Sequence, residues 1–118
     1  RTRVLPGDLL IAITGEYLGM VAIVPNDIPV SYVNQHIAIV RIDQARLDPR
    51  FVAHCYASPI GQQQIWRFND GGTKPGMNLD GVRRLPVIDL PIEQQRTEEA
   101  VLSQLDEQTR DLMKRFHD

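Results

Sequence analysis

Short apolar runs separated by turn-forming residues dominate the first half of the chain. Two of these runs, at residues 9–13 and 20–24, flank a turn with glycine at both ends, and this order predicts a β-hairpin. The run at residues 9–13 has no polar interruption, so we expect both faces of that strand to be buried. A third run, residues 32–42, predicts another strand that is interrupted by Asn34 and Gln35.

After residue 47 the hydrophobic spacing becomes that of helices. Asp48-Pro49 and Ser58-Pro59 each join a capping side chain to a proline at the first helical position, so each predicts the start of a helix. The first helix presents an apolar face at Phe51, Val52, Cys55 and Tyr56. For the second helix we expect an inner stripe of Ile60, Gln64, Ile65 and Phe68. Both helices are expected to pack on the strands.

The last third of the chain predicts a loop, a turn of helix, a strand and a long helix. Residues 69–76 are rich in glycine, Asn78 can cap a helical turn at residues 79–82, and residues 85–90 form an apolar run. Pro91 begins the long helix, which carries a seam at spacings of three and four: Leu102, Leu105, Thr109, Leu112 and Phe116. Such a seam is typical of a coiled coil, and equally of an amphipathic helix that packs on its own domain.

These elements predict an α/β fold of the mixed α+β kind, with a small domain at residues 1–90 and a C-terminal coiled-coil-type helix at residues 91–118. The chain has 118 residues, which suits one modest core, and its first residue, Arg1, suggests a piece of a longer protein. The single cysteine, Cys55, excludes an intrachain disulfide and favours a reducing, cytoplasmic location. No apolar run is long enough for a membrane span.

Charge is distributed unevenly along the chain. The net charge is −2, but residues 1–88 carry nine Lys and Arg against seven Asp and Glu, whereas residues 89–118 carry four against eight. Because acidic helices repel phosphates, any contact with nucleic acid is expected in the first part.

The sequence offers little support for catalysis. It has no phosphate-binding P-loop and no dinucleotide-binding glycine motif, so no cofactor is predicted. His36, His54 and His117 are far apart and have no neighbours at metal-ligand spacing, so no metal is predicted either. No pair of carboxylates stands out as general acid and base. We therefore predict a non-catalytic protein.

Binding is better supported, by two loops that combine glycine with polar or aromatic residues. These loops, TGEYLG and NDGGTKPGM, could bring backbone N–H groups close to phosphates while their side chains reach base edges. The cations that could anchor such a complex are Arg67, Lys74, Arg83 and Arg84. Plain turn geometry also explains the glycines, and loops of this composition bind peptides and sugars as well.

Six segments in order carry a resemblance to a known family: GDLLIAITGEYLG, VAIVP, SYVNQHIAIVR, a Ser-Pro-x-Gly helix start, GGTKPGMNLDGVRRLPV and LPIEQQ. The chain resembles the second half of a target recognition domain, followed by the start of the conserved spacer helix, in the DNA-specificity subunit of type I restriction–modification systems. The resemblance implies a non-catalytic module that binds one half of a split double-stranded DNA target. It also implies a spacer helix that pairs with a second helix, and docking of methylation and restriction subunits.

The resemblance, taken with the loop composition, gives a set of candidate DNA-binding residues: Thr14, Gly15, Glu16, Tyr17, Asn34, Gln35, Arg67, Gly72, Thr73, Lys74, Met77, Asn78, Arg83 and Arg84. It also makes the seam residues a helix interface, through which the chain could associate with itself. The sequence departs from the family at Ile13, where a basic residue is common, at Leu90 before Pro91, and at Gln94. These departures leave open a second interpretation, a scaffold or dimerisation fragment that does not read DNA.

Overall fold

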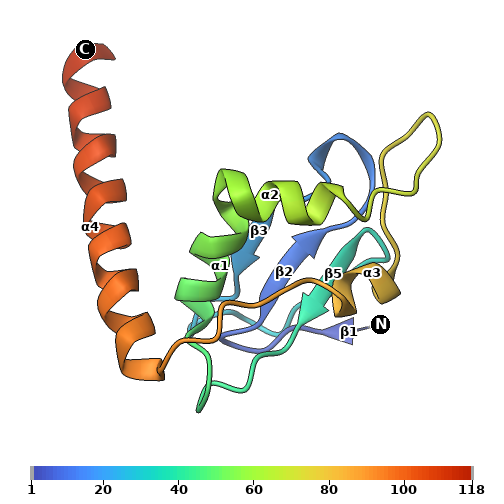
Figure 1. The fold of residues 1–118 in the computed structure, drawn as a ribbon, viewed down its shortest axis with the longest axis horizontal. Coiled ribbons are helices and arrows are strands. Elements are labelled where there is room, and N and C mark those ends of the chain that lie inside the picture. The colour runs from blue at the N-terminus through green and yellow to red at the C-terminus, as the bar shows by residue number, and fades with distance from the viewer. Residues whose placement is uncertain (1, 118) are drawn as a thin grey trace.

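The computed structural model describes residues 2–117, so the first residue of the predicted domain and the last of the predicted helix lie outside the described part. The fold is a mixed α+β fold, as predicted. Its centre is a three-stranded antiparallel sheet in the order β3-β2-β5, made by β2 (Leu9–Ala12), β3 (Val21–Ile23) and β5 (Ile37–Val40) (Figure 1). The predicted hairpin is confirmed, because Leu10 pairs with Ala22 of β3.

The central strand, β2, is buried as its uninterrupted apolar run predicts. Leu9 and Ile11 are completely inaccessible to solvent and belong to the core cluster. On its other side β2 pairs with β5, with Leu10 opposite Ile39 and Ala12 opposite Ile37. A strand with neighbours on both sides has its backbone N–H and C=O groups satisfied by ladder hydrogen bonds, so it tolerates this burial.

The polar pair at residues 34–35 divides the third apolar run into two strands. β4 (Tyr32–Val33) pairs with β1 (Thr2–Arg3) in a separate two-stranded sheet, and β5 joins the central sheet. The predicted interruption is thus confirmed. It lies at the point where the chain passes from one sheet to the other.

An ion pair between Asp8 and Arg41 lies at the start of β2. Arg41 donates from Nε to Asp8 Oδ1 at 2.9 Å and from Nη2 to Asp8 Oδ2 at 2.8 Å, and the Leu5 N–H also donates to Asp8 Oδ2. Asp8 is almost fully buried, whereas the Arg41 side chain is about half exposed. The hydrogen bonds from Arg41 outweigh the burial and hold the pKa of Asp8 below its usual range.

Both predicted helix starts are confirmed. α1 (Pro49–Ala57) begins after Asp48, which accepts from the Arg50 N–H, and α2 (Pro59–Trp66) begins after Ser58, whose Oγ accepts from the Gly61 N–H. Gly61 lies so close to the end of α1 that a Cβ there would be 2.0 Å from the carbonyl oxygen of Cys55. Glycine therefore permits the tight join between the two helices.

The predicted inner stripe of α2 is only partly right. Ile65 is fully buried and Phe68 packs against the core, but Ile60 is 72% exposed. Gly61 and Ile65, four residues apart, form the inner face of this short helix. Ile60 is about 100° round the helix from Gly61 and so points outward.

The strand predicted at residues 85–90 is wrong. Asn78 caps α3 (Leu79–Arg83) as predicted, by accepting from the Gly81 N–H at 2.8 Å, but the segment that follows is extended and has no ladder partner. Leu85 is the buried end of this segment, whereas Val87 and Ile88 are about half exposed. Residues 85–90 instead cross the body to the base of the last helix (Figure 1).

The last helix, α4 (Ile92–His117), is fixed at its base by a buried glutamine. Gln95 accepts from the Asp48 N–H at 2.9 Å and donates to the carbonyl oxygens of Arg46 and Leu90, at 3.1 and 2.7 Å. Beyond its first turns the helix rises beside α1, and its distal half extends away from the body (Figure 1). Among residues 2–117, no helix contains an apolar stretch sufficient to cross a bilayer.

Candidate nucleic-acid interface

The turn after β2 and the glycine-rich loop lie against each other, although sixty residues of chain separate them. The Gly15 N–H donates to the Pro75 carbonyl at 2.8 Å, and the Met77 N–H donates to the Ile13 carbonyl at 2.9 Å. Thr14 and Gly76 form an antiparallel bridge between these two bonds. Main-chain hydrogen bonds therefore hold the two predicted binding loops together at one end of the central sheet.

Glycine is required in the turn for conformational reasons. Gly15 opens the short 3-10 helix η1 (Gly15–Tyr17) at φ 81°, and Gly19 closes the turn at φ 94°, a region of backbone space that L-residues rarely adopt. Gly15 is also buried under the Lys74 side chain, whose Cε lies 3.3 Å from the position of a Cβ at residue 15. Lys74 thus crosses the turn from the neighbouring loop.

The glycine-rich loop has a closed base and an open tip. Asn69 Oδ1 accepts from the N–H groups of Gly71 and Gly76 at 3.2 and 3.0 Å, and the Asp70 N–H donates to the Gly76 carbonyl at 2.8 Å. Residues 72–74 are exposed at the tip, which projects from the body on the side away from α4 (Figure 1).

A third segment joins the same edge through His36, which the sequence did not single out as a binding residue. The His36 carbonyl accepts from the Ile13 N–H at 2.9 Å, and its Nδ1 lies 2.6 Å from Thr14 Oγ1. The His36 N–H donates to Asn34 Oδ1 at 2.9 Å. Single-sequence reasoning missed His36 because only the register of β2 and β5 reveals which residue lies beside Thr14.

We call this surface the loop edge and define it as residues 14–17, 34–36 and 72–74. It contains nine of the fourteen candidate DNA-binding residues: Thr14, Gly15, Glu16, Tyr17, Asn34, Gln35, Gly72, Thr73 and Lys74. Tyr17 is 61% exposed there. Three segments that are distant in the sequence thus form one surface.

Several of the remaining candidates have structural roles. The prediction that Met77 contacts DNA is wrong, because Met77 is only 5% exposed and packs in the core. Asn78 uses its side-chain oxygen to cap α3, and its amide donates to Asp70 at 3.3 Å. Arg84 pairs with Asp80 on the surface of α3 at 3.3 Å.

Arg67 and Arg83 are exposed and lie outside the loop edge. Arg67 directly follows α2 and donates to Gln64 at 3.0 Å, and Arg83 lies in the last turn of α3. The loop edge itself contains one cation, Lys74, and one carboxylate, Glu16. Polar and aromatic groups therefore outnumber charges on this surface.

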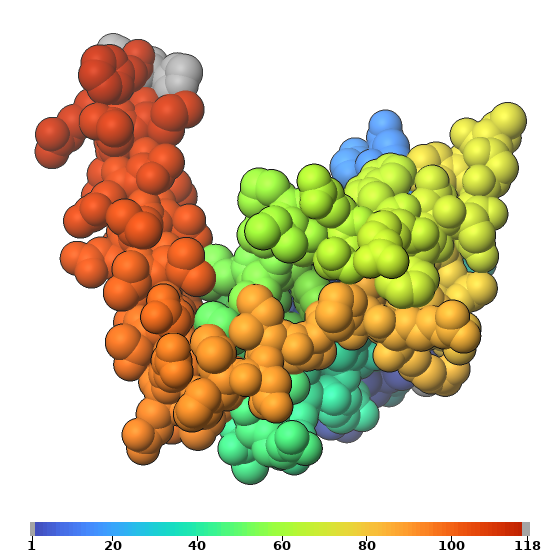
Figure 2. Space-filling model, in the orientation of Figure 1, coloured from blue at the N-terminus to red at the C-terminus, as the bar shows by residue number. Residues whose placement is uncertain are grey.

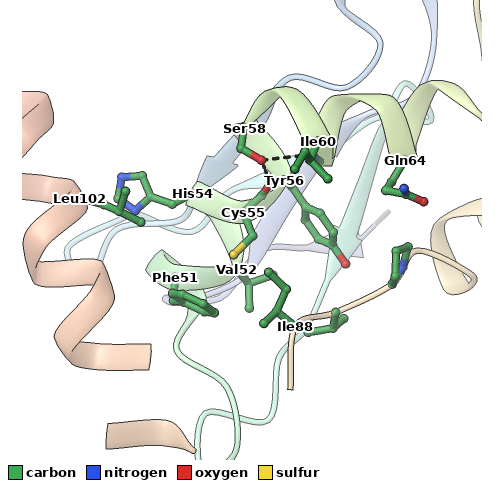
Figure 3. Close-up of a pocket in the computed structure, with 13 residues that line it drawn as sticks. Phe51, Val52, His54, Cys55, Tyr56, Ser58, Ile60, Gln64, Ile88 and Leu102 are labelled. Atoms are coloured by element: carbon green, nitrogen blue, oxygen red, sulfur yellow. Dashed lines mark hydrogen bonds between the residues drawn. The ribbon is translucent and has the colours of Figure 1, made fainter. Parts of the chain in front are cut away.

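A mainly apolar hollow lies elsewhere, between α1, α2, residues 86–88 and α4 (Figure 3). It has a volume of about 530 Å³, and its apolar lining includes Phe51, Val52, Ile60, Val87, Ile88 and Leu102. Cys55 also lines it, and burial raises the pKa of the Cys55 thiol and of the nearby Tyr56 hydroxyl. Both groups stay protonated near neutral pH, which makes them poor nucleophiles.

Comparison with known proteins does not name a family for this chain. A scan against models of protein families finds no match, and a search of the curated proteins finds no similar sequence. Among residues 2–117, no group of three His, Cys, Asp or Glu side chains could hold a metal ion. The resemblance to the specificity subunits therefore rests on the six segments quoted above.

Proposed function

We propose that the chain is a sequence-recognition module for double-stranded DNA, of the kind found in type I specificity subunits, and that the loop edge contacts one half of a bipartite target. The single observation that carries this proposal is the meeting of three candidate binding segments at one exposed edge through main-chain hydrogen bonds. Because the backbone holds the edge together, most side chains at its surface are available for contacts with DNA.

Two kinds of contact with DNA are expected, at the loop edge and at Arg83 outside it. Lys74 on the loop edge and Arg83 on α3 would bind phosphates, which fixes the position of the module but carries no sequence information. Thr73 and Gln35 would reach base edges, where a hydroxyl and an amide can read donors and acceptors. In this proposal the module has no catalytic role, is cytoplasmic and acts with methylation and restriction subunits.

The C-terminal helix would set the distance to a second half-site. Its seam residues Leu105, Leu112 and Phe116 are at least half exposed, so they do not pack on their own domain. The resemblance implies a spacer helix that pairs with another helix, and an exposed apolar seam supports that role.

The experiment compares DNA binding by single-residue variants in fluorescence anisotropy with a pool of target sequences. Lys74→Ala and Arg83→Ala should weaken binding to all sequences and reduce the salt slope by about one unit each. Thr73→Ala should change which sequences are preferred. Lys114→Ala, which removes a cation from the distal half of α4, is the matched control and should leave binding unaltered.

A second candidate function, a scaffold that does not read DNA, is favoured by the exposed seam together with the net charge of −2. The same anisotropy series separates the two candidates. Binding that falls steeply with added salt supports DNA recognition. Absence of binding at low salt contradicts it and supports the scaffold.

A further inference from the structure

The apolar hollow between α1, α2, residues 86–88 and α4 has no role in the proposed function, yet it has the size and composition of a small-molecule site. Its volume is about 530 Å³, and sites for small molecules enclose roughly 300–1,000 Å³. Separate segments of the chain form its walls, so the surface is concave (Figures 2 and 3). Small-molecule sites are mostly apolar and contain a few polar groups that fix the orientation of the ligand.

One polar group of this kind is the hydroxyl of Tyr56. Tyr56 lines the hollow and is only 6% exposed, and its hydroxyl has no hydrogen-bond partner among residues 2–117. Figure 3 shows the Tyr56 ring pointing away from α1, toward the segment that carries Ile88. Because buried tyrosine hydroxyls usually have a hydrogen-bond partner, this hydroxyl is a donor for a molecule that enters the hollow.

The lining of the hollow favours a neutral ligand over an anion. Within the described residues, the lining contains no Lys, Arg, Asp or Glu. His54 is the one lining side chain that can gain a positive charge, and it already faces two carboxylates of α4. Its Nε2 lies 3.0 Å from Asp106 Oδ2, and its Nδ1 lies 3.8 Å from Glu99 Oε1. A carboxylate ligand would therefore lose its hydration without gaining a free cation, which is costly.

We propose that the hollow binds a neutral, mainly apolar small molecule with one oxygen acceptor for the Tyr56 hydroxyl. An amide or a ketone on an apolar chain or ring has this chemistry. The apolar part of the ligand would cover Ile60 and Ile88, which are 72% and 52% exposed on the walls. Because Leu102 of α4 also lines the hollow, the ligand would contact both the last helix and the body. DNA recognition concerns the loop edge and does not depend on this site.

Two neutral probes test the site in amide NMR titrations of the wild-type chain: octanamide, with an acyl chain, and benzylacetone, with an aromatic ring. We expect saturable shifts of residues around the hollow with at least one probe, and the probe that binds identifies chain or ring as the preferred apolar part. Each probe has a matched anion of similar shape, octanoate and hydrocinnamate. The anion should bind on the order of tenfold more weakly than its neutral counterpart, or not at all.

Two variants test the lining. Tyr56→Phe keeps the ring and removes the hydroxyl, so it should weaken binding of the neutral probe by about two- to tenfold, the effect of one net hydrogen bond. Its matched control is Tyr32→Phe, which changes an exposed tyrosine outside the hollow and should leave the affinity unaltered. Ile88→Trp places a large ring on a half-exposed wall and should abolish binding, while the amide spectrum verifies that the variant is folded.

Cys55 gives a chemical readout, because it is the only cysteine of the chain and lines the hollow. A probe at about ten times its dissociation constant should slow the alkylation of Cys55 by iodoacetamide about tenfold, since the thiol is covered in the bound form. In Tyr56→Phe the same protection should require a higher probe concentration, by the factor that NMR measures.

Several outcomes would overturn the site. One is the absence of saturable shifts with both probes, and another is equal binding of an anion and its neutral counterpart. Equal affinities of the wild-type chain and Tyr56→Phe would exclude the hydroxyl as the donor. Shifts around the hollow that grow with protein concentration, without any probe, would show that a second copy of the chain occupies it. Alkylation of Cys55 at an unchanged rate would place the probe elsewhere.

Discussion

The loop edge and α4 are attached to the same body by different kinds of bond. At the loop edge, main-chain hydrogen bonds join segments 13–15, 36 and 75–77, and side chains such as Thr73 and Lys74 remain at the surface. α4 is held by side chains instead, chiefly by Gln95 at its base and by the contact between Asp106 and His54. Surface substitutions at the loop edge can therefore change contacts without loss of the fold, whereas single substitutions can release α4.

The largest loss of stability is expected from Gln95→Leu, which removes the side-chain hydrogen bonds at the base of α4. The substitution leaves the Asp48 N–H and the Arg46 and Leu90 carbonyls without their partner in a part-buried site. A fully buried group left without a partner costs about 1–3 kcal/mol. Because these three groups are only part-buried, we expect a total loss of about 2–4 kcal/mol in the free energy of unfolding. Urea denaturation measures it, with the exposed Gln94→Ala as a control expected within about 0.5 kcal/mol of wild type. Equal stabilities of the two variants would contradict the role of Gln95.

The next largest loss of stability is expected at the base of the glycine-rich loop. A Cβ at residue 71 would lie 2.1 Å from the Lys74 carbonyl oxygen, whereas one at residue 72 would meet nothing within 4 Å. Gly71→Ala should therefore cost about 1–3 kcal/mol and displace the tip, and Gly72→Ala should be nearly neutral. Thermal unfolding together with DNA binding measures both variants. If Gly72→Ala proved the more damaging, the described loop geometry would be wrong.

A smaller loss of stability is expected at the start of β2, at the end away from the loop edge. The ion pair between Asp8 and Arg41 lies there. Arg41 lowers the pKa of Asp8, so the pair stabilises the fold above the ordinary pKa of aspartate, about 3.9, and this contribution is lost as the pH falls through the lowered value. Because Arg41 is about half exposed, we expect Arg41→Gln to lower the stability at pH 7 by less than Gly71→Ala does. Urea denaturation across the pH range should show the difference from wild type shrinking below pH ~4. A difference that grows in acid would contradict this sign.

The smallest effect on stability is expected at His36. His36→Asn can keep a polar atom near Thr14, at the position of the His36 Nδ1. His36→Gln instead moves its amide toward the position of the His36 Nε2, away from Thr14. The contact is exposed, so both variants should unfold within about 0.5 kcal/mol of wild type. We expect His36→Gln to alter target preference more than His36→Asn does, as measured by selection from a pool of DNA sequences. Identical preferences in both variants would place His36 outside the reading surface.

Local signals in the sequence predicted the elements whose causes are local. The caps at Asp48, Ser58 and Asn78 formed as expected, since each depends on a side chain and a backbone N–H two or three residues away. The burial of the run at residues 9–13 followed from its composition. The predictions of an inward-facing Ile60 and of a strand at residues 85–90 were wrong, because apolar character alone does not show which face of a segment has a neighbour.

The candidate site was predicted in its parts but not in its arrangement. The sequence by itself determined the turn, the polar interruption and the glycine-rich loop, because glycine, asparagine and proline act on the backbone where they stand. Only the tertiary structure decided that these parts meet, that His36 joins them and that Met77 does not. It also decided that Gln95 is buried and Phe116 exposed on one helix. Strand register and helix docking are set by contacts between residues far apart in the chain, and no local pattern records them.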